Sequence, residues 1–281
     1  MRTPYLLFAM LTLLIGLAAP PAAVAADLEK KTEANWTTYV DLTQKRIEGE
    51  LGSRSKAFLI RNLKKPKDAA EILEKLKNKE VYVEKMQTKD ARGNEIDVDG
   101  GIVHHWYGTV FIPNMTAARL LRWIQNYGDH HKYFKEVEKS NILKPSSEPS
   151  TFDIHLQLVR TKVVTVHYDT DHHVTFRQHT PGRVSSKSIS TRIQEIESAG
   201  EKTQKLKPAG KDSGYFWHTN GYWRYEEADG GVYVECESLS LSRGIPWGVG
   251  WIVGHFVESV PRESLDTMLT SIRDGSKSAP R

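Results

Sequence analysis

The chain has 281 residues, with 39 basic residues against 35 acidic ones and a formal net charge of +4. The basic residues are also scattered, so the composition argues against nucleic acid as the partner, which requires a concentrated basic surface. The single cysteine, Cys236, excludes an internal disulfide, and stability must therefore come from a core that a chain of this length is able to bury.

The N-terminus has the three parts of a secretory signal. Arg2 supplies a basic start, residues 6–17 form an apolar run too short to span a bilayer comfortably, and Ala23 to Ala25 form a small-x-small cleavage site. The sequence therefore predicts a signal peptide over residues 1–26 and an exported protein, periplasmic or extracellular.

Residues 27–79 have a charged, helical pattern with two narrow apolar stripes. One stripe is formed by Trp36, Val40 and Ile47, and the other lies between residues 72 and 76. We expect an N-terminal helical extension that docks on the main domain through a few apolar anchors.

Residues 80–274 are expected to form the main domain. Alternating or apolar runs predict strands at 80–88 and 102–112, and Pro113 ends the second of these before a short helix. Later strands are expected at 152–160, 163–168, 172–179, 184–196, 222–227 and 232–243. From Val249 onward, apolar residues at spacings of three and four predict a long helix with one buried face, and residues 275–281 are expected to be a disordered tail. The fold class is α+β.

Several motifs carry a resemblance to a known superfamily. They are GGIVHHWYGTVFIP from Gly100, RTKVVTVHY from Arg160, STRIQEIE from Ser190, GYWRYEE from Gly221, VECESLSLSRGIP from Val234 and VPRESL from Val260. In this order of elements, they resemble the START-like or SRPBCC superfamily, also called polyketide-cyclase/lipid-transport-like, and in particular its exported bacterial members. The resemblance covers about residues 100–273. It implies a helix-grip fold, in which a curved antiparallel sheet of about seven strands wraps a long C-terminal helix around an apolar cavity.

Metal and nucleophile chemistry find little support in the sequence. There are 11 histidines, but pairs such as His104 and His105 are adjacent on a predicted strand, where neighbouring side chains point to opposite faces. No Gly-x-Ser-x-Gly motif occurs, and Cys236 lies within a strand of core residues. We predict no metal, no cofactor and no catalytic residue.

Charged residues within the late strands leave two interpretations open. Arg192, Arg224 and Glu237 form either an Arg–Glu network that locks the sheet or a cationic site for an anionic head group. The predicted ligand-binding residues are His104, Trp106, Tyr107, Arg192, Arg224, Tyr225, Glu237, Ile252, Val253 and Phe256.

Most members of the superfamily bind lipids or other hydrophobic ligands, while some are cyclases, hydrolases or ring-hydroxylase subunits. The leading hypothesis is an exported protein that holds a hydrophobic or amphipathic small molecule between sheet and C-terminal helix. One rival is an enzyme that uses His104, Tyr107 or an Arg–Glu pair for acid–base work, and another is a structural module without ligand. The segment from Trp247 to Trp251 allows a transient membrane contact.

The signal-peptide prediction is tested by the mature N-terminus. Because the basic start, the apolar run and the cleavage site occur together, mass spectrometry of the exported protein is expected to place the first residue at Ala26 or within one or two residues of it. An exported protein that retains Met1 would contradict the prediction.

Overall fold

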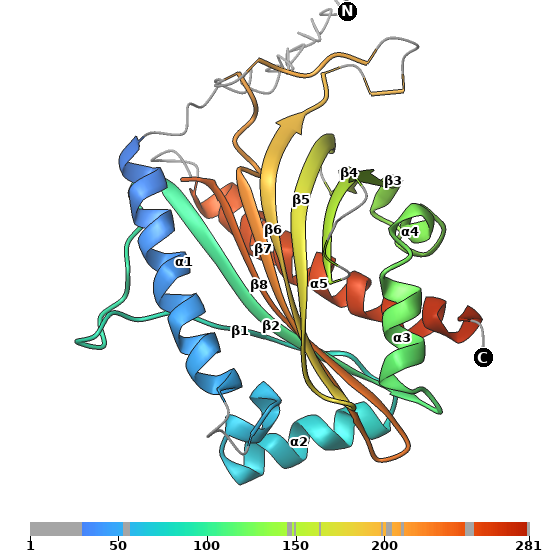
Figure 1. Ribbon diagram of the computed structural model, residues 1–281. Coiled ribbons are helices and arrows are strands. Elements are labelled where there is room, and N and C mark those ends of the chain that lie inside the picture. The colour runs from blue at the N-terminus through green and yellow to red at the C-terminus, as the bar shows by residue number, and fades with distance from the viewer. Residues whose placement is uncertain are drawn as a thin grey trace, which may run out of the picture.

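The computed structural model describes residues 30–279 apart from 53–56, 145–147, 149, 163, 198, 201–203, 209–210 and 245–249; for residues 250–258 it describes the helix but not the side chains. An antiparallel sheet lies between two helical layers (Figure 1). The strands are β1 (Tyr82–Lys85), β2 (Gly101–Pro113), β3 (Val137–Lys144), β4 (Thr151–Thr161), β5 (Thr165–Thr180), β6 (Arg183–Glu195), β7 (His218–Ala228) and β8 (Gly231–Arg243), in the order β1-β2-β8-β7-β6-β5-β4-β3. The helices are α1 (Lys30–Leu51), η1 (Ile60–Leu63), α2 (Pro66–Lys77), α3 (Ala117–Ile124), η2 (Tyr127–Asp129), α4 (His130–Tyr133), α5 (Gly250–Gly275) and η3 (Ser276–Ser278).

The C-terminal helix α5 packs on one face of the sheet, together with α3 and α4. Leu265, Leu269 and Ile272 are buried there in a cluster with apolar residues of β2 and β8. The approach is close at Gly108 of β2, where an added Cβ atom would lie 2.6 Å from Cδ1 of Leu269. A glycine at this position therefore allows the helix to lie directly on the strand.

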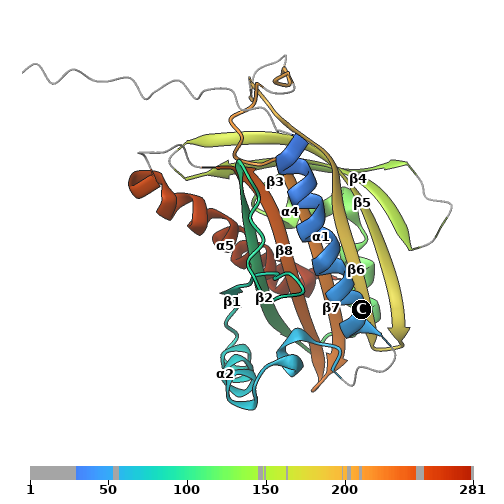
Figure 2. The same cartoon turned by 90° about the vertical axis from the view of Figure 1, so that its left-hand side faces the viewer.

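The N-terminal helices cover the other face, as Figure 2 shows for α1 lying over the strands. Trp36 and Tyr39 of α1 pack with Leu239 and Leu241 of β8. Helix α2 begins at Pro66 and buries its own apolar stripe in a separate cluster around Tyr233. The predicted docking of these helices through a few apolar anchors thus corresponds to two clusters on one face of the sheet.

The predicted α+β fold, with a twisted antiparallel sheet and a long C-terminal helix on it, is confirmed, and the chain's own elements have the START-like, helix-grip arrangement. The described residues form eight strands rather than about seven. Strand β3 was not predicted because its side chains are mostly polar and exposed. Strand β5 runs through Asp169 and Asp171, where two strands were predicted, because Arg192 of β6 binds both carboxylates.

Of the tail expected to be disordered over residues 275–281, the structure describes residues 275–279. Residues 276–278 form η3, and Ala279 is buried. Its carbonyl oxygen accepts a hydrogen bond of 2.6 Å from Nη2 of Arg119 in α3. This contact holds the chain after α5 against α3.

Residues 1–29, with the predicted signal peptide, lie outside the described residues. No helix in the described part of the chain is both long and apolar enough to cross a membrane.

The packing of α5 generates a stability prediction. Leu269 has no exposed surface, so Leu269→Ala leaves a cavity beneath the helix and is expected to cost about 2 to 5 kcal/mol of unfolding free energy. Chemical denaturation measures this loss. Leu63→Ala is the matched control because Leu63 is 46% exposed, and its expected effect is within about 0.5 kcal/mol. Equal losses in the two variants would show that α5 does not form the core.

Candidate functional site

Strand alternation divides the sheet into two faces with different chemistry. We call the face that meets α5 the inner face; Gly108 and Val110 of β2 belong to it. We call the face that meets α1 and α2 the outer face; Tyr107 and Phe111 of the same strand belong to it. Pairing registers extend this assignment across β8, β7, β6, β5 and β4.

Part of the inner face is built from small side chains. Residues Ser188 of β6, Gly221 of β7 and Ser238 of β8 are paired in one row, and Trp106 of β2 completes that row. We define the small-residue floor as Ser188, Ser190, Thr219, Gly221, Ser238 and Ser240. Farther along the same strands the inner face carries large apolar side chains such as Val234, which pack in the cluster of α5. The floor therefore differs from the part of the inner face that the helix fills.

Aromatic rings border the small-residue floor. Trp106 and Trp223 are both half-buried, and the Trp223 indole is stacked on the Tyr225 ring with centroids 6.3 Å apart. A Cβ atom at Gly221 would come within 3.0 Å of Nε1 of Trp223. Gly221 thus gives the indole room to lie along the floor.

Two imidazoles of the inner face lie within hydrogen-bonding distance of hydroxyl groups. Nε2 of His104 lies 2.9 Å from the Ser242 hydroxyl, and Nε2 of His172 lies 3.0 Å from the Thr170 hydroxyl. The Thr170 hydroxyl donates to the Leu156 carbonyl, so its oxygen accepts from Nε2–H of His172. Burial lowers the pKa of His172 to about 4, so its ring is uncharged at neutral pH.

The structure brings only some of the predicted site residues together. His104, Trp106 and Tyr225 lie on the inner face. Ile252, Val253 and Phe256 belong to α5, but their side chains lie outside the described residues.

Four predicted ligand residues lie on the outer face instead. They are Tyr107, Arg192, Arg224 and Glu237. For Tyr107, Arg224 and Glu237 alternation is the physical reason, because one strand is unable to present neighbours such as Trp106 and Tyr107 to the same side. For Arg192 the reason is a β-bulge, since the pairing of β6 with β5 shifts between Ser190 and Arg192. The grouping of these residues with His104 and Trp106 around one ligand is therefore corrected here.

Glu237 stands at the centre of a buried network beneath α1. It accepts hydrogen bonds from Arg46 of α1 and, at 2.7 Å, from Nε2 of His105. The Tyr39 oxygen accepts from the Thr88 amide at 2.7 Å, so its hydroxyl proton is directed to Nδ1 of His105, 2.8 Å away. This arrangement leaves Nε2–H of the imidazole to donate to Glu237.

Glu235 is a second buried carboxylate, and it binds the backbone of η1. Its carboxylate accepts from the amides of Ile60 at 2.6 Å and Arg61 at 3.2 Å and from the Tyr107 hydroxyl at 2.6 Å. Arg224 donates to the Phe58 carbonyl at 3.0 Å and also binds Glu50 of α1. Of the two interpretations of the Arg–Glu residues, these contacts match the structural network.

Burial acts on the two carboxylates with different outcomes. Burial raises the pKa of Glu235, and its hydrogen-bond donors only partly offset that effect. For Glu237, burial also acts to raise the pKa, but the hydrogen bond from His105 and the charge and hydrogen bond of Arg46 outweigh it and lower the pKa. Glu237 is therefore the carboxylate that the network stabilises in its ionised form.

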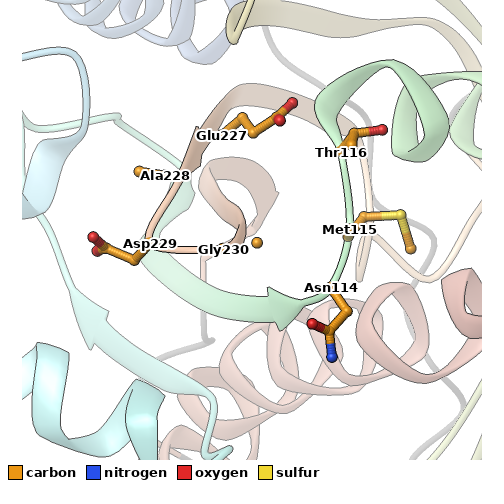
Figure 3. A pocket seen from close by; sticks show the side chains of 8 residues that line it. Asn114, Met115, Thr116, Glu227, Ala228, Asp229 and Gly230 are labelled. Atoms are coloured by element: carbon orange, nitrogen blue, oxygen red, sulfur yellow. The ribbon is translucent and has the colours of Figure 1, made fainter.

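Two surface pockets lie away from the inner face. One, of about 420 Å³, lies between the turn that joins β7 to β8 and the segment that follows β2 (Figure 3). Its Glu227 accepts a 2.8 Å hydrogen bond from the Ala117 amide at the start of α3. The other, of about 440 Å³, lies between α2 and Tyr233. Neither contains a predicted site residue, and among the described residues no three His, Cys, Asp or Glu side chains are placed to hold a metal ion.

Comparison with known proteins gives similarity to solved structures alone, because no family model and no curated protein matches the chain. The human StAR-related lipid transfer protein 5 is 10% identical, with a TM-score of 0.47 over 88% of this chain and 98% of that one. A STAR-related lipid transfer protein from Xanthomonas axonopodis is 15% identical, with a TM-score of 0.43 over 64% of this chain and 96% of that fragment. The Zhui aromatase/cyclase from Streptomyces sp. R1128 is 12% identical, with a TM-score of 0.38 over 63% of this chain and 94% of that one.

The outer-face network generates a pH prediction. The stability that Glu237 contributes is fully present above its ordinary pKa of 4.5 and is lost as the pH falls through the lower folded-state pKa. Glu237→Gln is therefore expected to reduce the unfolding free energy at pH 7 by about 1 to 3 kcal/mol and to flatten its decline below pH 4.5. Denaturation between pH 7 and pH 3 measures both effects.

Glu48→Gln serves as the control, since Glu48 is an exposed acid on α1 that pairs with exposed Arg177. Its stability is expected to follow the wild-type pH dependence. If the Glu237 and Glu48 variants lose stability alike at every pH, the network does not stabilise an ionised Glu237.

Proposed function

We propose that the protein is an exported binding protein that holds a hydrophobic or amphipathic small molecule between the inner face and α5. The observation that carries the proposal is the small-residue floor bordered by half-buried Trp106 and Trp223. Small side chains fill less volume than the large apolar residues elsewhere on the same strands, such as Val234. Indole rings beside such a floor suit a ligand that is bound mainly through its apolar area.

The distribution of acid–base groups favours binding over catalysis. His104 lies on the inner face, whereas Tyr107 lies on the outer face, has no exposed surface and donates to Glu235. Arg224 and Glu237 are likewise buried on the outer face, where they bind Glu50 and Arg46 of α1. The groups considered for an enzyme are thus divided between two sides of the sheet.

The site is tested by filling the floor. Ser188→Trp places a large ring on the floor and is expected to weaken binding of Nile red, an uncharged fluorescent hydrophobe, at least about tenfold, equal to about 1.4 kcal/mol. Lys187→Trp is the matched control, because Lys187 precedes Ser188 on β6, is exposed and faces the other side. Fluorescence titration of both folded variants gives the comparison.

Native mass spectrometry of protein purified from its own host complements the titration, with a co-purified hydrophobic molecule as the expected result. Equal Nile red affinity in the wild type and both variants would contradict the site. A wild-type protein that binds no hydrophobic molecule in either experiment would contradict the function.

A further inference from the structure

Tyr168 of β5 is a buried side chain whose hydroxyl has no hydrogen-bond partner in the described part of the chain. By strand alternation it lies on the inner face, between Leu158 of β4 and Glu195 of β6. Its exposed fraction is 5%, and its hydroxyl makes no hydrogen bond to any described residue. Its ring meets the Phe216 ring edge-on, with centroids 5.4 Å apart. A buried hydroxyl without a partner costs free energy. Tyr168 is therefore a candidate to donate a hydrogen bond to a bound molecule.

The charged groups that act on the Tyr168 hydroxyl are carboxylates. Burial is the largest cause of its raised pKa, followed by the charges of Glu195 and Asp212. Glu195 is itself buried, and its carboxylate accepts three hydrogen bonds. Nζ of Lys207 donates one at 2.7 Å, and Ser213 donates two, through its amide at 2.7 Å and its hydroxyl at 2.9 Å. Lys207 is therefore committed to Glu195.

The arginines that were expected to meet a head group are engaged elsewhere. Arg192 lies on the outer face and binds Asp169 and Asp171. On the inner face, Arg160 of β4 binds Glu136 and, at 2.9 Å, Glu263 of α5. These two acids balance the charges of Arg160 and its neighbour Lys162, which also binds Glu263.

We propose that the ligand is an uncharged amphiphile whose hydroxyl or carbonyl oxygen accepts a hydrogen bond from Tyr168 while its apolar part lies over the small-residue floor. This inference rests on the proposed function and names the class of its ligand. An anionic head group would be repelled by Glu195 and Asp212. An ammonium head group has no acceptor for the Tyr168 proton. An alcohol, ester or ketone satisfies the hydroxyl without adding a charge.

Three probes with the same hydrocarbon chain test the inference, since oleyl alcohol, oleate and oleylamine differ in head group alone. They are compared by displacement of Nile red at pH 8, below their aggregation concentrations. Oleyl alcohol is expected to displace the dye at a concentration at least about tenfold lower than the other two. Both charged head groups lose their hydration on burial, oleate adds a negative charge beside Glu195 and Asp212, and the ammonium of oleylamine has no acceptor for the Tyr168 proton.

Tyr168→Phe separates a ligand contact from a structural role. The change is expected to weaken oleyl alcohol binding about fivefold, as the loss of one hydrogen bond usually does. The melting temperature without ligand is expected to stay constant or rise, since the hydroxyl has no partner among the residues that the structure describes. Tyr233→Phe is the matched control on the outer face, where the hydroxyl bonds to Asp229 at 2.7 Å, and it is expected to leave all affinities unchanged.

The outcomes distinguish this inference from the proposed function. If Nile red binds but oleate displaces it as well as oleyl alcohol does, the uncharged-ligand inference is overturned while the binding function stands. If Tyr168→Phe keeps the wild-type affinity for oleyl alcohol, Tyr168 is not the contact and the inference is overturned. If neither Nile red nor any probe binds the folded protein, both the inference and the proposed function are overturned.

Discussion

Two carboxylates buried on β8, Glu235 and Glu237, set the arrangement of the N-terminal half of the protein. A buried charge persists only with partners, and each of these acids has one partner in β2 and others in segments that precede the sheet. Glu237 binds Arg46 of α1, and Glu235 binds backbone amides of η1. The outer face is committed to these contacts, and the proposed ligand is therefore assigned to the inner face with α5.

The two faces thereby acquire different chemistry. The outer face carries ionised groups paired with one another, such as Arg192 with Asp169 and Asp171. The inner face has ion pairs at its far strands, Arg160 with Glu136 and Glu263 and Glu195 with Lys207. Around the small-residue floor it carries hydroxyl side chains, indoles and the neutral imidazole of His172. This separation connects packing to binding, because an apolar ligand gains from leaving water only where no unpaired charge shares its site.

Much of the fold was predictable from periodicity, since alternation and the spacing of apolar residues after Val249 depend on local pattern alone. Alternation also groups side chains by face, but which group meets α5 depends on packing; Gly108, beneath Leu269, was the available signal. Tyr168 was not predicted as a site residue. Its surroundings combine β5 with Asp212 and Phe216, which are close only in the folded chain.

Bromine quenching of tryptophan fluorescence tests the central claim most directly, because it reports which face a bound ligand touches. The chain has 7 tryptophans, and variants that keep only Trp223 or only Trp36 place the single indole on the inner or the outer face. A brominated fatty alcohol is expected to quench the Trp223 variant strongly and to leave the Trp36 variant unchanged. Quenching of Trp36 without quenching of Trp223 would contradict a ligand between the sheet and α5.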